Sequence, residues 1–245
     1  FNAHNKPAPS VSVCGLFSCF GIKCMVTILK DSNGLAGNRL MVGAVLLAAG
    51  SASRMGHQPK CLLELDGVSL IRRQLIALFA AGVDEVVVVL GHYGEHIERA
   101  ISRMPVCVVY NPTPDDGQVS SLRVGLQALS FDVDAVVVGL ADQPLIHAQD
   151  IFDLMAAYKA RPIWTEVVQP TVGGLPGNPV MFSGLVRSGI LVDHAHVGCK
   201  QWQHANPTSV HAWDTANVRY RIDVDTPEDI EALALSSGYQ LKWPQ

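Results

Sequence analysis

Between residues 41 and 160, short runs of apolar and β-branched residues alternate with segments whose apolar residues recur at helical spacing. The short runs predict buried strands at 42–47, 85–90, 106–110 and 135–140. The remaining segments predict helices at 69–82, 95–104, 120–129 and 148–159. Because strands and helices alternate, we expect an α/β fold, with a Rossmann-like, mostly parallel twisted sheet and helices on both faces.

Ligands of such sheets bind beyond the carboxyl ends of the strands. The loops at 48–60, 91–94 and 141–144 follow predicted strands, so we expect them to surround the site. Residues 164–212 are less regular and richer in Pro, Gly, His and Trp, which favours a second lobe at the same edge. Residues 221–225 predict one more short strand, before a helix whose N-cap is Thr226.

The first forty residues show neither strand nor helix periodicity, and Met41 directly precedes the first expected strand. We therefore expect residues 1–40 to be an extension outside the fold, and residues 41–245 to form a single domain. The apolar run at 11–22 leaves a targeting segment as the alternative. Lys23 interrupts this run before it reaches the length of a membrane span.

Charge and cysteine content narrow the possible function classes. The formal net charge of the 245 residues is −4, so there is no global basic field for nucleic acid, and we expect neither a nucleic-acid nor a membrane partner. Six cysteines are scattered without C-x-x-C pairs. This spacing argues against a zinc site and a disulfide scaffold and favours a reducing, cytoplasmic location.

The loop after the first expected strand has the composition of a phosphate-binding loop. Gly50 and Gly56 allow backbone turns and close approaches, so that N–H groups can converge on phosphate oxygens. Arg54 and Lys60 add positive charge for a triphosphate. The simpler alternative is a strand-to-helix turn with two solvated cations. The glycine spacing fits neither a Walker A motif nor the dinucleotide G-x-G-x-x-G.

Two further features lie near the same edge. Asp142 follows the apolar strand at 135–140, where a carboxylate either binds magnesium together with phosphate oxygens or caps the next helix. Ser120 and Ser121 are expected at a helix N-terminus, which favours anions, and Arg123 lies beside them.

The stretch from Leu46 to Lys60 resembles the L-A-[AG]-G-x-S-x-R-M-G-x-x-K signature of the nucleotidyltransferases that act on molybdopterin. Asp142-Gln143-Pro144 matches the D-x-P of that family, and residues 223–229 match its D-x-D-T-P-E-D motif. Residues 120–126 match an S-S-L-R-x-G-L string of the cytidylyl-transferring branch. The resemblance extends from Met41 to the C-terminal helix, and at Asn178 the sequence departs from the histidine that is usual in the family.

The resemblance implies roles for individual residues. The catalytic residues would be Arg54, Lys60 and Asp142. Mg²⁺ would be held by Asp142 and Asp225, with Asp223 as a possible substitute. The nucleotide would be bound by Leu47, Ala48, Ala49, Gly50, Ser51, Ser53, Gly56, Ser120, Ser121 and Arg123. The lobe at 164–212 would bind the acceptor through Gln169, Gly177, Asn178 and Pro179.

The expected reaction is transfer of CMP from CTP to the terminal phosphate of molybdopterin, with or without bound molybdenum. Ala49 gives the L-A-A-G form common in the cytidylyl branch, whereas guanylyl transferases usually have L-A-G-G. A molybdenum oxidoreductase would receive the product. The alternatives are a guanylyl or a sugar- or polyol-phosphate nucleotidyltransferase, or a carrier of molybdenum cofactor without catalysis, which Asn178 favours.

Overall fold

The computed structural model describes residues 39–193 and 197–244. Residues 1–38 of the expected extension lie outside the described residues, which leaves only its last two, Arg39 and Leu40, to be compared. From Arg39 onward the chain forms one compact unit. No helix among the described residues has both the length and the apolar character that a membrane crossing requires.

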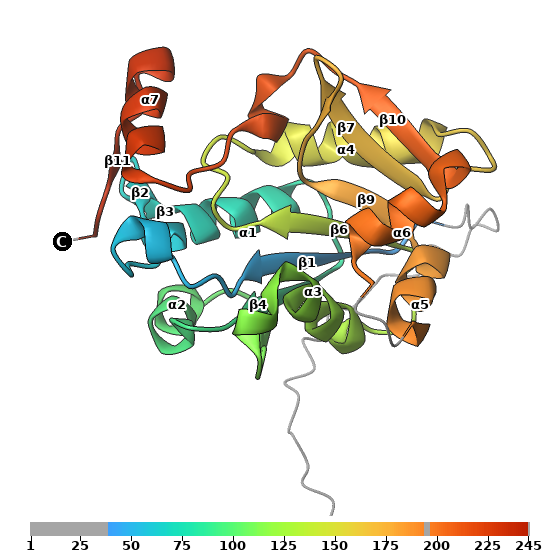
Figure 1. Cartoon of the computed structure of the whole chain (residues 1–245), viewed down its shortest axis with the longest axis horizontal. Helices are drawn as coiled ribbons and strands as arrows, with labels where there is room; N and C mark the ends of the chain where they lie inside the picture. The colour runs from blue at the N-terminus through green and yellow to red at the C-terminus, as the bar shows by residue number, and fades with distance from the viewer. Residues whose placement is uncertain (1–38, 194–196, 245) are drawn as a thin grey trace, which may run out of the picture. The chain divides into compact units, whose positions relative to one another are not determined.

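The main sheet has the strand order β10-β7-β9-β6-β1-β4-β5, with the short β8 paired to β7 (Figure 1). Its parallel centre consists of β6 (Ala135–Leu140), β1 (Val42–Ala48), β4 (Glu85–Leu90) and β5 (Cys107–Tyr110). The other strands are β7 (Val167–Val172), β8 (Leu175–Pro176), β9 (Val180–Ser183) and β10 (Val210–Asp214). Only the β8 and β9 pairings are antiparallel, so the expected mostly parallel sheet is confirmed.

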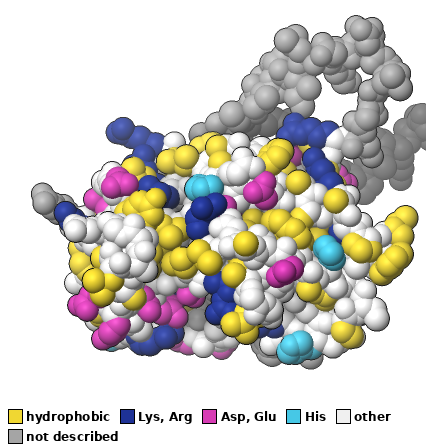
Figure 2. Space-filling view, turned by 90° about the horizontal axis from the view of Figure 1, so that it is seen from above, with side chains coloured by type: hydrophobic (Ala, Val, Ile, Leu, Met, Phe, Trp, Pro, Cys, Tyr) yellow, Lys and Arg dark blue, Asp and Glu magenta, His cyan; other side chains and the backbone are white. Residues whose placement is uncertain are grey.

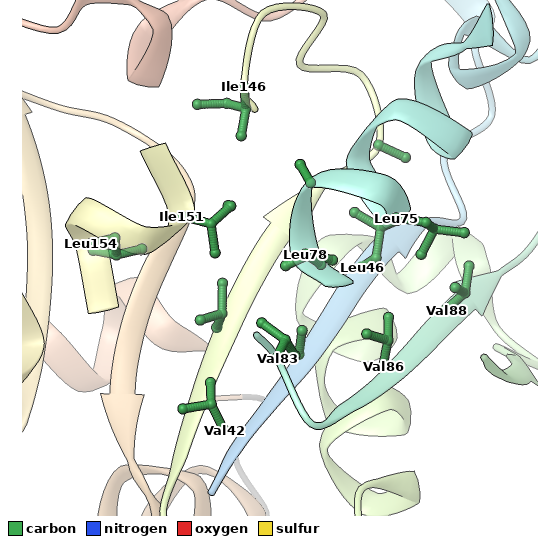
Figure 3. Packing of buried hydrophobic residues seen from close by; sticks show 14 of the residues in the cluster. Val42, Leu46, Leu75, Leu78, Val83, Val86, Val88, Ile146, Ile151 and Leu154 are labelled. Carbon is green, nitrogen blue, oxygen red and sulfur yellow. The ribbon is translucent and has the colours of Figure 1, made fainter. Parts of the chain in front are cut away.

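Alternate residues of β1 enter two different cores, as the twofold period of a strand requires. Val42, Ala44 and Leu46 pack in one cluster with the apolar sides of α1 (Leu70–Ala80) and α4 (Ala148–Ala160) (Figure 3). Val45 and Leu47 pack in the other with α3 (Gly117–Ala128) and α5 (Gly184–Val192). Because both faces are covered, the strands are almost continuously apolar.

Smaller elements complete the unit. Ile97 and Ile101 of α2 (Gly94–Ile101) enter the first core, and Trp202 of α6 (Cys199–Ala205) packs against the second. A three-stranded sheet with the order β11-β2-β3 joins the C-terminus to the region before α1. Its strands are β2 (Glu64–Leu65), β3 (Val68–Ser69) and β11 (Leu241–Lys242). The sequence patterns did not predict this sheet, because two-residue strands have no detectable period.

Three expectations about elements were wrong. The segment 164–212 is not irregular: it supplies β7, β9 and β10 to the main sheet, although short strands interrupted by Pro and Gly obscured their pattern. Residues 221–225 form no strand, because a 3₁₀ turn (Val218–Arg221) occupies the start of the segment and residues 222–225 have no regular secondary structure. The third long helix begins at Gly117 rather than at Ser120.

The last helix, α7 (Pro227–Ser237), begins as predicted. Thr226 is its N-cap, and the Thr226 hydroxyl accepts from the backbone N–H of Asp229. Asp229 in turn accepts from the backbone N–H groups of Thr226 and Asp225. This capping box fixes the backbone beside Asp225, which matters for the site below.

Candidate active site

A cavity of about 380 Å³ lies at the carboxyl ends of β1, β4 and β6. Its walls are the loop after β1, the ends of the other two strands and the first turns of α3. The lining residues are Leu47 to Ala52, Pro59 to Cys61, His92, Ile97, Pro114, Asp115, Gly117, Gln118, Ser121 and Leu140 to Asp142. The cavity therefore occupies the position expected for a ligand site in this class of sheet.

The loop after β1 makes its turns at Ala52, Gly56 and His57, all of which have positive φ. Gly56 was expected to allow such a turn, but Gly50 has no positive φ, and Ala52 takes the left-handed conformation in its place. The Ala52 carbonyl accepts from the N–H groups of Met55 and His57, which holds this strained residue. The N–H groups of Gly50 and Ser51, both lining the cavity, have no hydrogen-bond partner among the described residues.

Lys60 lies at the base of the cavity between two carboxylates. Its Nζ is 2.5 Å from Oδ2 of Asp142 and forms an ion pair and hydrogen bond with Oδ1 of Asp225. Desolvation alone would lower the pKa of Lys60, but the two carboxylates together raise it above its usual value. Lys60 is therefore a stable ammonium that holds together residues from distant parts of the chain.

Asp142 is the more enclosed of the two acids. Burial raises the pKa of its carboxyl, and the negative charges of Asp223 and Asp225 add to this, while Lys60 opposes it. Its Oδ1 is buried and has no hydrogen-bond partner within the described residues. A buried carboxylate oxygen without a hydrogen-bond donor destabilises the folded protein unless a donor or a cation binds to it.

The donor set at this point fits a divalent cation. Asp142 and Asp225 both reach one Nζ atom, and the Asp142 Oδ1 atom remains available. Mg²⁺ usually takes one or two carboxylates and completes its shell with water and substrate phosphates. Among the described residues, no group of three or more His, Cys, Asp or Glu side chains is arranged to hold a metal ion, so phosphate and water would have to supply the other ligands.

Arg54 contacts the same charged residues from the solvent-exposed side, through Asp225. Its Nη2 is 3.3 Å from Oδ2 of Asp225, and its side chain is largely exposed. Asp225 therefore joins Arg54 and Lys60, while the capping box of α7 holds its backbone. The structure brings together the three expected catalytic residues and both expected metal ligands.

The nucleotide residues expected from the sequence fall into two groups. Leu47, Ala48, Ala49, Gly50, Ser51 and Ser121 line the cavity. Ser53, Gly56, Ser120 and Arg123 do not. Because α3 begins at Gly117, the serines lie within its first turns, and the cavity meets Gly117 and Gln118 at the helix N-terminus.

Side-chain hydrogen bonds hold Ser120, Ser121 and Arg123 of α3 in their positions. Asn111 donates to the Ser121 hydroxyl at 2.9 Å and accepts from the Ser120 hydroxyl at 3.1 Å. Arg123 points to α5, where its guanidinium donates to the carbonyls of Ile190 and Leu191. Arg123 thus has a structural contact in place of the expected nucleotide contact, and we leave it out of the nucleotide site.

The four expected acceptor residues lie outside the cavity lining, in and beside β7 and the segment before β9. Gln169 donates to the Gly177 carbonyl, and the Asn178 N–H donates to the Tyr220 carbonyl at 2.7 Å. A Cβ atom on Gly177 would lie 2.7 Å from the Tyr220 carbonyl oxygen, so this close backbone contact requires glycine. Pro179 follows in the same segment and leads into β9.

The loop at 91–94 was expected at the site, but the sequence did not show which partners its side chains contact. The Tyr93 hydroxyl donates to the Ser51 carbonyl at 2.9 Å and so fixes the loop after β1. His92 pairs with Asp115 at 3.1 Å across the cavity wall. Such contacts join segments far apart in the sequence, and a single tyrosine or histidine in a loop does not reveal its partner.

Cys61 lines the cavity but is not suited to nucleophilic chemistry. Burial, with a contribution from Asp142, raises the pKa of its thiol to about 12, so the thiol stays protonated at neutral pH. The cysteines within the described residues, Cys61, Cys107 and Cys199, are all free. Cys61 is therefore left out of the groups that could act on a ligand at this site.

Outside the cavity, charge is mixed. Figure 2 shows one face of the molecule, on which Lys and Arg side chains are interspersed with acidic and apolar ones. This pattern agrees with the small net charge of the chain. An anionic ligand would be held by the local arrangement of Lys60, Arg54 and the loop after β1 rather than by a broad positive field.

Comparisons with known proteins agree with this geometry. A family model described as the MobA-like NTP transferase domain matches residues 44–209. The bifunctional IPC transferase and DIPP synthase of Rubrobacter xylanophilus is 33% identical over 156 residues, 58% of this chain and 35% of that protein. The chain thus spans about a third of that relative's length. Nicotine blue oxidoreductase of Paenarthrobacter nicotinovorans is 26% identical over 197 residues, 78% of this chain and 96% of that protein.

Two solved structures are also similar to this chain. Rv0371c from Mycobacterium tuberculosis matches with a TM-score of 0.67 and 26% identity, over 80% of this chain and 99% of that one. A complex of that protein with manganese matches with a TM-score of 0.64 and 25% identity, over the same shares of the two chains. The similarity therefore covers 80% of this chain, and one of the two structures is a complex with manganese.

Proposed function

The chain belongs to the MobA-like NTP transferase family, and on that premise we propose that it transfers CMP from CTP to the terminal phosphate of molybdopterin. Nucleotidyl transfer is the coarser activity that family membership supports. The observation that carries the proposal is Lys60, whose ammonium joins Asp142 and Asp225 at the base of the cavity. This grouping of charges is suited to a metal–triphosphate.

The acceptor would need no activation by a protein base. A phosphate monoester is already anionic at neutral pH, so its oxygen would attack the α-phosphorus of CTP directly. A new P–O bond would form, the bond from the α-phosphorus to the bridging oxygen would break, and pyrophosphate would leave. Lys60 and Arg54 would balance the negative charge that develops on pyrophosphate, and the fixed loop and sheet would align the reactants.

Asp142 and Asp225 would hold Mg²⁺, which supplies charge neutralisation and orientation of the phosphates when it is bound. For this, Lys60 would exchange at least part of its contact with these carboxylates for contact with the phosphates. The free N–H groups of Gly50 and Ser51 would donate to phosphate oxygens. Gly50, Ser51, Lys60 and Asp142 line the cavity, and Asp225 is joined to it through Lys60.

We base the preference for CTP on Ala49, which is buried and lines the cavity. Ala49 also lies close to Gly91, where an added Cβ would come within 2.9 Å of the Ala49 methyl. If the base lies beside that methyl, the methyl favours the smaller pyrimidine. Selectivity of this steric kind amounts to about 1–3 kcal/mol per methylene.

The segment with Gln169, Gly177, Asn178 and Pro179 would bind the pterin side, and a molybdenum oxidoreductase would receive the product. A guanylyl or a sugar- or polyol-phosphate nucleotidyltransferase would keep the same charged groups and differ in base or acceptor. A carrier without catalysis is less favoured, because it has no use for the Lys60, Asp142 and Asp225 arrangement. We also propose a cytoplasmic location, which the three free cysteines of the described residues favour.

The proposal is tested by pyrophosphate release with Mg²⁺ and molybdenum-loaded molybdopterin, with CTP and GTP in separate reactions. Release with CTP alone is the expected result. Release with GTP alone would overturn the base assignment and keep the reaction type. No release with either, from folded protein that binds the pterin, would favour the carrier. Release with a sugar or polyol phosphate in place of the pterin would change the acceptor.

A further inference from the structure

The side chain of Gln143 joins three segments that surround the proposed metal site. It is 2% exposed, and its Nε2 donates to the Asn178 carbonyl at 3.0 Å and to the Tyr220 carbonyl at 3.3 Å. Its own backbone carbonyl accepts from Nε2 of Gln74 at 2.5 Å. One buried amide therefore connects the end of β6, the segment before β9 and the 3₁₀ turn at Val218–Arg221.

These connections act on the two proposed metal ligands. Gln143 directly follows Asp142, and Tyr220 lies in the segment that leads to Asp225. A second connection runs in parallel, because the Val224 N–H donates to the Asp142 carbonyl at 3.1 Å. The separation of the two carboxylates thus depends on how firmly the segment 220–225 is held to the end of β6.

Within the described part of the chain, the side-chain hydrogen bonds of Gln143 are made by the nitrogen of its amide and not by the oxygen. Its Oε1 is buried and has no partner among the described residues, whereas its Nε2 has two acceptors. A buried acceptor without a donor is unfavourable, and methionine would fill a similar volume without it. The glutamine is therefore explained by its N–H donors, which apolar side chains do not provide.

We propose that Gln143 is a positioning residue that sets the separation of Asp142 and Asp225 for a divalent cation. The inference rests on the proposed function for the identity of the metal site and deepens it. Gln143 acts through the two backbone carbonyls it holds and not through contact with the cation or the reacting atoms. Without its donors, the segment 220–225 is tied less firmly, and the carboxylates are less well placed.

The test compares Gln143→Met with the matched control Thr165→Val. Thr165 is also buried and also donates from its side chain to the backbone, although to one carbonyl, that of Pro162, and it does not line the cavity. Mn²⁺ is titrated into each protein saturated with CTP, without acceptor, and free Mn²⁺ is followed by electron paramagnetic resonance. Asp142→Ala gives the reference for a lost site, and thermal melts by circular dichroism show that each variant is folded.

We expect the half-saturating Mn²⁺ concentration to rise about tenfold or more in Gln143→Met and to stay unchanged in Thr165→Val. Equal Mn²⁺ binding in Gln143→Met and wild type would overturn the inference. If Gln143→Met does not fold, Gln143→Asn keeps the amide but draws its donors back by one methylene. The same rise is expected there, and wild-type affinity would overturn the inference.

The outcome is separable from that of the proposed function, because the titration requires no transfer. Wild-type protein that binds Mn²⁺ through Asp142 but transfers no CMP would refute the function and leave the inference in place. If Mn²⁺ binds wild type no better than Asp142→Ala, the metal site is wrong, and the role of Gln143 is wrong with it.

Discussion

At the scale of single residues, Lys60 and Asp142 form an ion pair between two side chains that are both mostly buried. Lys60→Ala leaves the Asp142 carboxylate without its ion-pair partner, whereas Asp142→Ala leaves Lys60 with Asp225 alone. Either change also removes a group that would act on the triphosphate or its metal. We predict that Lys60→Ala and Asp142→Ala each lower turnover by about a hundredfold or more. The measurement is pyrophosphate release, with Lys159→Ala, on the outer part of α4, as the control. Near-normal turnover in either variant would contradict their assignment.

The position of Lys60 also predicts that its ammonium competes with a divalent cation for the same two carboxylates. Its ammonium contacts both carboxylates that would hold a cation, so the two positive charges require the same oxygens. We predict that Lys60→Met binds Mn²⁺ more tightly than wild type when no nucleotide is present. Calorimetric titration measures the difference. Weaker binding in Lys60→Met would mean that Lys60 organises the carboxylates for the metal rather than occupying its place.

Much of the site at the residue scale was predictable, because the charged residues stand in a contiguous string or in short motifs. Arg54, Lys60 and Asp142 were expected near the site from their types and positions, the resemblance to a known family added Asp225, and the structure brings all four together. Arg123 was misplaced, because the sequence does not show that a helical arginine faces a neighbouring helix rather than a ligand. Gln143 and Tyr93 were missed for a related reason: their partners are backbone carbonyls of distant segments.

At the scale of elements, two arginines join α3 and α5, and each helix contributes one of them. Arg123 of α3 donates to carbonyls at the end of α5, and Arg187 of α5 donates to the carbonyls of Leu126, Leu129 and Ser130 at the end of α3. Both cations thus satisfy helix C-terminal carbonyls that have no partner within the helix. This pairing fixes the helix whose N-terminus meets the cavity.

Arg187 is the more buried of the two and makes three of these hydrogen bonds. We predict that Arg187→Met lowers the free energy of unfolding by about 3 kcal/mol, since several buried acceptors lose their donor. Urea unfolding followed by circular dichroism measures this loss. Arg123→Met should cost less, because fewer carbonyls are involved. Equal stability of wild type and Arg187→Met would show that the bonds contribute little.

A second inter-element contact predicts a dependence on pH. The buried carboxylate of Asp150, at the start of α4, binds Arg219 and Asn217 of the segment before Asp225. Burial alone would raise the pKa of Asp150, but the hydrogen bonds from Arg219, from the His147 N–H and from Asn217 lower it below its usual value.

A carboxyl whose pKa is lower in the folded state stabilises the fold above its unfolded pKa of about 3.9, and the stabilisation is lost as pH falls through the folded value. We therefore predict that Asp150→Asn is less stable than wild type at pH 7 and that the difference shrinks toward pH 3. Urea unfolding at both pH values measures it. A difference that stays constant with pH would mean that Asp150 acts by packing rather than by charge.

Element prediction succeeded where burial makes the pattern regular. The runs at Glu85–Leu90 and Ala135–Leu140 are buried on both faces, so their ends coincide with the predicted ones. It failed in the segment 164–212, where the strands of the main sheet are short and β7 ends at a turn formed by Gly173 and Gly174. There the strands are set by their neighbours in the sheet, which a local pattern does not contain.

At the scale of the whole molecule, the class of fold followed from alternation alone, whereas the full strand order did not. The parallel centre follows from right-handed connections between consecutive units. The antiparallel β9 lies between β6 and β7, and β10 returns to the edge beside β7. These positions depend on long-range pairings. They matter to function, because β7 and β9 carry the proposed acceptor residues to the same edge as Asp142.

The central claim is that the α-phosphoryl group of CTP is transferred with its nucleoside to the pterin phosphate. The most direct test is incubation of the full chain with Mg²⁺, molybdenum-loaded molybdopterin and CTP labelled at either the α- or the γ-phosphorus. The account predicts α-label in the pterin product and γ-label in pyrophosphate, in equal amounts. Label from the γ-position in the product, or no labelled product while the nucleotide and pterin both bind, would contradict it.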